Sequence, residues 1–132
     1  MCINMKTKIL LGLLLLGLVL INGCGQYSSG DRVGTVNKFS EKGFFSKTWE
    51  GQMLLGGLKQ TGEGYEANIF EFSIDKYSKH GENKGDLVSK ITECLNSGKR
   101  CKLHYDEEII SSPFRSDTSY FITEVEILEN EN

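Results

Sequence analysis

Apolar and polar residues alternate in several segments of the chain, which is the pattern of strands with one buried face. The clearest segment is residues 69–74, where Phe70, Phe72 and Ile74 alternate with Glu71 and Ser73. The alternation predicts five strands, at residues 31–39, 44–55, 69–74, 100–106 and 119–128.

The second of these strands has two chemically distinct faces. Its apolar members share one parity and are expected to face the core: Phe45, Trp49, Met53 and Leu55. Its polar members have the other parity and are expected to face outward: Ser46, Thr48, Glu50 and Gln52. In the first strand Gly34 interrupts the pattern, as glycine does where a strand must bulge or bend.

A single segment of the globular part has helical spacing. Leu87, Ile91, Cys94 and Leu95 fall at i, i+4, i+7 and i+8, which forms one apolar stripe. Asp86 is expected to cap the start of this helix, and Asn-Ser-Gly at 96–98 to end it. The connections are expected to be a hairpin turn at 40–43, an exposed glycine-rich loop at 56–66 and a polar segment at 75–85.

The resulting order is β-β-β-α-β-β, in a mainly β protein with one helix. This is the order of the OB-fold, a five-stranded Greek-key barrel, which is the fold that we expect. An open antiparallel sheet with one helix on its face fits the same order and is kept as the alternative.

The N-terminal segment has a different composition. Lys6 and Lys8 precede an uninterrupted apolar run of 13 residues, 9–21. A basic start followed by such a run is typical of a secretory signal, and 13 residues are too few to span a bilayer. Residues 1–23 are therefore expected to be an export signal.

The apolar run ends in Ile-Asn-Gly-Cys at 21–24, which resembles the lipobox of bacterial lipoproteins. The resemblance implies that Cys24 is lipidated and becomes the mature N-terminus, anchored to a membrane but not crossing it. Gly25 follows, and the resemblance to lipoprotein sorting implies the outer membrane, facing the periplasm. Residues 24–30 are then expected to be a tether, and 31–130 a single domain.

Removal of the signal leaves all 18 acidic residues but takes away Lys6 and Lys8, so the formal net charge falls from −3 to −5. An acidic exported domain is a poor partner for nucleic acid. Cys94 and Cys101 remain in a compartment that permits disulfides. They are expected to form a bridge, with two buried thiols as the alternative; a zinc site with His104 lacks a fourth ligand.

Several motifs resemble a family of small bacterial and phage-associated proteins, among them lipoproteins. They are GDRVGTV at 30–36, KFS at 38–40, KTWEG at 47–51, GKRCKLHY at 98–105 and TSYFIT at 118–123. The resemblance implies no activity. Some members carry a 6-phosphogluconate dehydrogenase label, and GEGYEA at 62–67 matches G-x-G-x-x-A. A strand, not a helix, is expected to follow this match, so no dinucleotide and no other cofactor is expected.

The most distinctive polar and aromatic residues lie on the outward face of the second and third strands and in nearby loops. The candidate binding residues are Phe44, Lys47, Thr48, Glu50, Tyr65, Glu71 and Arg115. Trp49 is a ligand candidate on the OB-fold, but its parity also fits core packing. No catalytic residue is expected. If the protein were an enzyme, its candidate catalytic residues would be His104 beside acids, or Ser78 near His80.

These features predict a membrane-anchored envelope module that binds a protein, peptide or glycan without catalysis. A phage-type exclusion factor and a small envelope enzyme are the alternatives.

Overall fold

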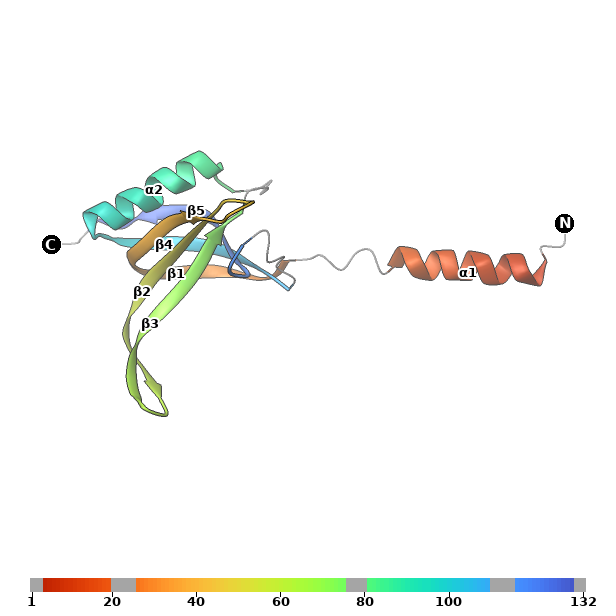
Figure 1. Ribbon diagram of the computed structural model, residues 1–132, viewed down its shortest axis with the longest axis horizontal. Coiled ribbons are helices and arrows are strands. Elements are labelled where there is room, and N and C mark those ends of the chain that lie inside the picture. The colour runs from red at the N-terminus through yellow and green to blue at the C-terminus, as the bar shows by residue number, and fades with distance from the viewer. Residues whose placement is uncertain (1–3, 20–25, 76–80, 110–115, 130–132) are drawn as a thin grey trace.

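After an N-terminal helix, the chain follows the predicted order of three strands, one helix and two strands (Figure 1). The computed structural model describes residues 4–19, 26–75, 81–109 and 116–129. Its elements are α1 (Met5–Val19), β1 (Gln26–Lys42), β2 (Thr48–Thr61), β3 (Gly64–Ile74), α2 (Lys84–Ser97), β4 (Arg100–Glu108) and β5 (Tyr120–Ile127). No helix within these ranges has both the length and the hydropathy to cross a membrane.

The five strands form one mixed sheet that closes into a ring in the order β1-β2-β3-β5-β4. All pairs are antiparallel except β3 and β5, which are parallel and meet at Ser73 and Phe121. The alternative of an open antiparallel sheet is therefore wrong.

The ring closes because β1 pairs with a strand on each side. Its first part pairs with β4, its last part with β2, and Thr35 is paired with both neighbours. A side chain at Gly34 would clash with the carbonyl oxygen of Leu54 on β2. Glycine is thus needed at this position because two backbones approach closely, while the change of register lies nearby, between Val36 and Lys38.

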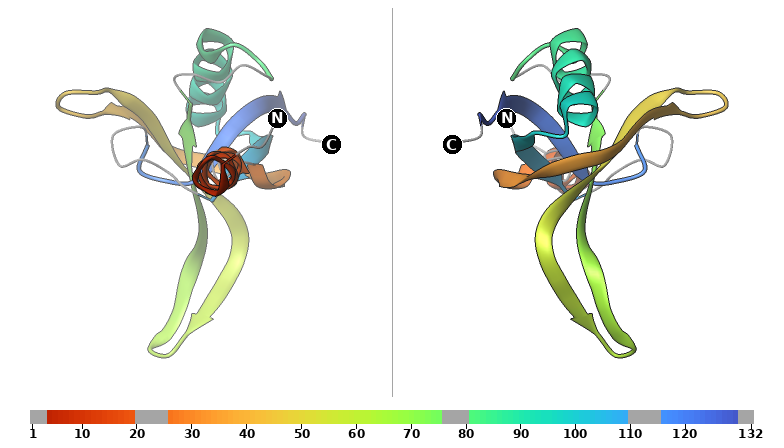
Figure 2. Two further views of the ribbon diagram at one scale, coloured as in Figure 1. Left: turned by 90° about the vertical axis from the view of Figure 1, so that its right-hand side faces the viewer. Right: turned by 90° about the vertical axis from the view of Figure 1, so that its left-hand side faces the viewer.

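The inward parities predicted for the strands are largely confirmed. The fully buried residues of the ring interior come from four strands: Met53, Phe72, Ile74, Leu103 and Ile122. Helix α2 adds Leu87, Ile91 and Cys94 and packs against β1 and β5. Figure 2 shows α2 lying across one side of the ring.

Helix α2 begins earlier than the apolar stripe indicated. Asn83 is the N-cap, and its side-chain oxygen accepts a hydrogen bond from the Asp86 backbone N–H at 2.9 Å. Asp86, the predicted cap, lies in the first turn instead, because Lys84 and Gly85 are already helical. At the other end Gly98 takes the left-handed conformation and donates its N–H to the Cys94 carbonyl, as predicted.

Two predicted boundaries around β1 are wrong. Residues 26–30, expected to be part of a flexible tether, are paired with β4. β1 also continues through Lys42, so the turn lies at 43–47 and not at 40–43. Phe45, predicted to face the core from the second strand, is in this turn and is 94% exposed.

The predicted loop at 56–66 is a β-hairpin instead. Leu58 pairs with Ala67 and Gln60 with Tyr65, and we call residues 58–67 the arm. Gly56 and Gly57 have positive φ and occupy the register shift at its base. The arm projects well beyond the ring (Figures 1 and 2).

The predicted disulfide between Cys94 and Cys101 is present, with a Cα–Cα distance of 6.3 Å. It joins the end of α2 to the start of β4, and both residues are fully buried. The bridge therefore holds the helix against the ring.

Replacing both bridge cysteines with alanine is expected to lower the free energy of unfolding by about 2.5 kcal/mol, because an eight-residue loop is no longer closed in the unfolded chain. Urea unfolding followed by Trp49 fluorescence measures this loss. Reducing agent should destabilise the unmodified protein to a similar extent and leave the double variant unchanged. A loss below about 0.5 kcal/mol in both experiments would contradict a bridge that constrains the fold.

Candidate binding groove between strands β3 and β5

A groove of about 600 Å³ lies beside strand β3. Its lining comes from β1, β2, β3, the start of β5 and the segment before β5: Arg32, Leu55, Asn68, Ile69, Phe70, Glu71, Asp117, Thr118, Ser119 and Tyr120. β3 and β5 are paired only at Ser73 and Phe121, so the groove lies between the part of β3 before Ser73 and the chain that leads into β5.

Three aromatic rings pack together at the groove. Phe70, Tyr105 and Tyr120 lie with their ring centroids 5.3 to 5.4 Å apart, in tilted and edge-to-face pairs. The three aromatic side chains come from β3, β4 and β5, so the closure of the sheet brings them together. Edge-to-face contacts favour defined ring orientations, so Tyr105 supports the Phe70 and Tyr120 rings that line the groove.

Arg32 completes this aromatic group. Its guanidinium carbon lies 5.6 Å from the Phe70 ring centroid and 5.8 Å from that of Tyr105. Within the described residues, no ion pair joins Arg32 to a carboxylate. The guanidinium is therefore oriented by cation–π contacts while its N–H groups remain available to a ligand.

Tyr120 has an environment that keeps its phenol neutral. Burial raises the pKa of this side chain above 10.0, and the nearby Glu107 carboxylate raises it further. Glu107 also accepts a hydrogen bond of 2.6 Å from the Ser28 hydroxyl. The groove thus presents a neutral phenol and the cation of Arg32, together with the carboxylates of Glu71 and Asp117.

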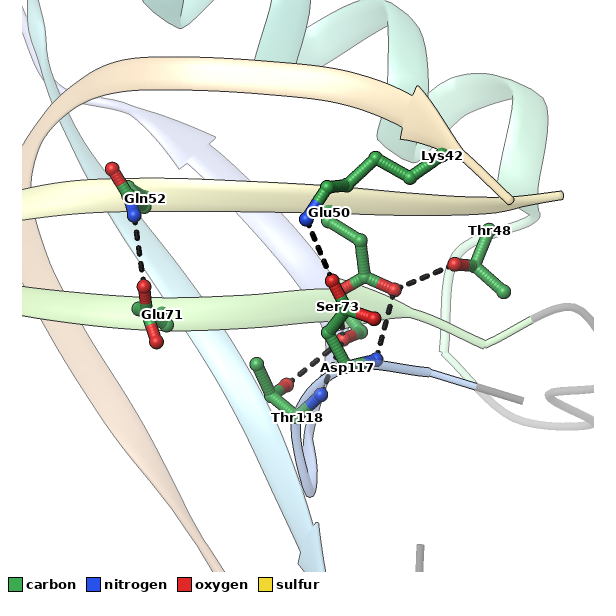
Figure 3. A network of polar contacts seen from close by, with 8 residues as sticks. All are labelled: Lys42, Thr48, Glu50, Gln52, Glu71, Ser73, Asp117 and Thr118. Carbon is green, nitrogen blue, oxygen red and sulfur yellow. Dashed lines mark hydrogen bonds and ion pairs between the residues drawn. The ribbon is translucent and has the colours of Figure 1, made fainter. Parts of the chain in front are cut away.

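A buried polar network lies beside the groove and is drawn in Figure 3. Glu50 is only 7% exposed, and its Oε1 accepts bonds from the Thr48 hydroxyl at 2.7 Å and the Asp117 backbone N–H at 3.2 Å. The Ser73 hydroxyl donates to Glu50 Oε2 and lies 2.9 Å from the Thr118 hydroxyl. These bonds hold residues 117 and 118 against the sheet.

This network corrects two of the predicted binding residues. Thr48 and Glu50 do have the outward parity on β2, but both are buried because the segment before β5 packs over them. Asp117 is held there from a second direction by an ion pair of 2.7 Å with Lys42, which raises the pKa of Lys42. Thr48 and Glu50 are therefore buried, and Glu50 helps to position the groove wall.

The remaining predicted binding residues lie in separate places. Glu71 lines the groove and accepts a hydrogen bond of 2.8 Å from Gln52. Tyr65 is 69% exposed, but it belongs to the paired arm and not to a loop. Phe44 and Lys47 are exposed on the β1–β2 turn. Arg115 lies outside the described residues.

Trp49 stacks on Phe39 with a centroid distance of 4.8 Å and packs against the core. This observation favours the core-packing alternative over a role as a ligand platform. The lone tryptophan is thus an internal support of β2.

The pairs considered for catalysis are incomplete among the described residues. His104 Nδ1 lies 2.8 Å from Asp31 Oδ1 on the ring exterior, as part of the β1–β4 pairing. Ser78 and His80 lie outside the described residues. Within the described ranges, no group of three or more His, Cys, Asp or Glu side chains could hold a metal ion.

Sequence reasoning missed Arg32 as a site residue, although a signal was present. Arg32 has the same parity as Gly34 and Val36, both of which are buried, although the Arg32 side chain itself is exposed. Tyr105 has the parity of Cys101 and Leu103, which are buried, but its neighbours from β3 and β5 could be known only after the strands were paired.

Replacing Glu50 with alanine is expected to lower the free energy of unfolding by about 2–3 kcal/mol, because the buried Ser73 and Thr48 hydroxyls lose their acceptor. The matched control is Glu71→Ala, which removes an exposed carboxylate from the adjacent strand and should cost at most about 0.5 kcal/mol. Urea unfolding measures both. Equal losses would show that the Glu50 network has no special structural role.

Comparison with models of protein families, with curated proteins and with solved structures finds no match for this chain. The resemblance to small bacterial and phage-associated proteins therefore stays a prediction. The groove is interpreted from its own residues and their geometry.

Proposed function

We propose that the chain is an exported bacterial lipoprotein, anchored at Cys24 to the outer membrane and acting there as a binding module without catalysis. The basic start, the 13-residue apolar run and the lipobox-like sequence at 21–24 support export and lipidation. The disulfide between Cys94 and Cys101 also fits an oxidising compartment such as the periplasm. Cys24 itself lies outside the described residues.

The closed ring supports assignment of the domain to the OB-fold, as a five-stranded Greek-key barrel. The supporting features are β1 shared between β2 and β4, the parallel contact between β3 and β5, and a helix between β3 and β4. Small barrels commonly take ligands at their mouths, and the groove is lined by residues of several strands and of the chain that leads into β5.

The ligand is, in this proposal, an extended segment of an envelope protein that carries a carboxylate. The observation that carries the proposal is the groove itself, in which Arg32 is oriented by two aromatic rings. A guanidinium held in this way can bind a carboxylate through two parallel hydrogen bonds. The aromatic wall supplies apolar contact area at small cost in side-chain entropy.

An extended polypeptide is favoured over a glycan by the edge of β3. Among the described strands, β3 has no neighbour on this side between Gly64 and Phe72. A peptide added along such an edge gains main-chain hydrogen bonds, and side-chain pockets beside it provide specificity. The groove residues Asn68 to Glu71 belong to this edge.

The binding site is tested by photo-crosslinking in intact cells. A photoreactive phenylalanine analogue in place of Ser119 in the groove should give an adduct with one envelope protein. The same analogue at Lys102, which pairs with Glu126 elsewhere on the ring, is the control. Arg32→Ala should reduce the adduct about tenfold, because a charge-assisted bidentate contact is lost.

Arg100→Ala is the matched control for loss of a cation and should leave the adduct unchanged, since Arg100 is exposed on β4 outside the groove lining. Adducts of equal yield from Ser119 and Lys102, or no effect of Arg32→Ala, would overturn the groove as the site.

The anchor is tested separately by the mass of the mature N-terminal peptide, which should begin at Cys24 and carry acyl chains. A mature peptide without acyl mass would overturn the anchor alone.

A further inference from the structure

The β1–β2 turn at residues 43–47 carries two neighbouring phenylalanines that no other described residue covers. Phe44 is 92% and Phe45 94% exposed, the largest exposed fractions of any large apolar side chain in the described structure. Their rings pack against each other with a centroid distance of 4.8 Å. We call residues 43–47 the aromatic turn.

The backbone makes the aromatic turn tight. Gly43 has a φ of 126°, and a side chain there would clash with the carbonyl oxygen of Ser46. A residue with a Cβ is strained in this conformation, so glycine is required. The tight turn presents Phe44 and Phe45 together, between Lys42 and Lys47.

Single exposed apolar residues are ordinary on protein surfaces, but an adjacent aromatic pair between lysines has a more specific physical meaning. Aromatic rings partition into the boundary between lipid headgroups and acyl chains, while a lysine such as Lys47 can extend to the anionic phosphates; Lys42 is ion-paired with Asp117. The composition of the aromatic turn is suited to a phospholipid surface.

The position of β1 adds a second argument, which rests on the lipidation proposed above. β1 begins at Gln26, two residues after Cys24, and two residues extend at most about 7 Å. An acylated Cys24 would therefore hold the start of β1 close to the headgroups. A domain on a long flexible tether would not be held close to the membrane in this way.

The aromatic turn is connected to the same side of the molecule as the start of β1. Lys42 pairs with Asp117, the Glu108 backbone N–H donates to the Ser119 carbonyl at 3.0 Å, and Glu108 is paired with Gln26. In Figure 1 the turn between β1 and β2 and the start of β1 both lie on the right-hand side of the ring. Figure 2 shows the turn reaching out beyond the ring.

We propose that Phe44 and Phe45 insert into the phospholipid surface to which Cys24 is anchored, as a second membrane contact. A protein held by the acyl chains alone can rotate about its tether. Insertion of the aromatic turn adds a separate point of attachment and so fixes the orientation of the groove relative to the membrane.

The test uses the full chain, purified as the acylated protein and reconstituted in vesicles of phosphatidylethanolamine and phosphatidylglycerol. Trp49→Phe removes the native fluorophore, and Phe45→Trp then places the sole indole on the aromatic turn. Tyr65→Trp in the same background is the matched control, because Tyr65 is an exposed aromatic residue on the arm. Lipids with brominated acyl chains quench indoles that enter the membrane.

The expected result is quenching of the Phe45→Trp protein at least about threefold stronger than that of the Tyr65→Trp protein, with blue-shifted emission. Weak quenching of both, or equal quenching of both, overturns the proposal, because the turn then has no particular contact with lipid. If the aromatic turn contacts a protein instead of lipid, both indoles should be quenched weakly.

The mass of the N-terminal peptide shows whether Cys24 is acylated. An error in the proposed anchor can therefore be told apart from an error in the proposed lipid contact of the aromatic turn. If Cys24 proves not to be acylated, the same variants are added to vesicles as soluble proteins. Sedimentation with the vesicles that is lost on Phe44→Ser with Phe45→Ser supports the aromatic turn as a lipid contact. No sedimentation of either protein overturns it.

Discussion

The close approach of β1 to β2 at Gly34 is the constraint on which the rest of the structure depends. β1 has to leave β4 and join β2 within a single strand, and the carbonyl of Leu54 occupies the space that a side chain at Gly34 would need. Because β1 pairs on both sides, the sheet closes and has one interior. Every other feature of the molecule is arranged relative to that interior.

Closure explains both the buried network and the groove. β5 reaches β3 at one point only, at Ser73, where Glu50 and Thr118 meet around the same hydroxyl. The polar network holds the chain before β5 against the sheet. The groove lies on the same side of this point, between that chain and the part of β3 before Ser73. One short contact thus positions both the network and the groove.

The three polar and aromatic regions have distinct physical characters. The network around Glu50 is buried and satisfied, so its role is structural. The groove combines an oriented cation with aromatic rings, which is the character of a recognition site. The aromatic turn is exposed and apolar and suits a lipid surface.

The sequence by itself determined the order of the elements, the inward parity of most strands, the C-cap at Gly98 and the disulfide. These properties depend on local periodicity or on the chemistry of single residues, and such signals survive without knowledge of the fold. Boundaries were less well predicted: β1, the arm and the start of α2 all extend beyond the apolar pattern, because pairing and capping include polar residues.

Only the tertiary structure decided which residues form the site. The parity of Glu50 indicated solvent, but burial depends on what covers a face, and residues 116–118 come from a segment more than sixty positions away. Arg32 became a site residue for the same reason, because Phe70 and Tyr105 reach it from other strands. Periodicity reports the direction of a side chain, whereas long-range pairing determines what that side chain meets.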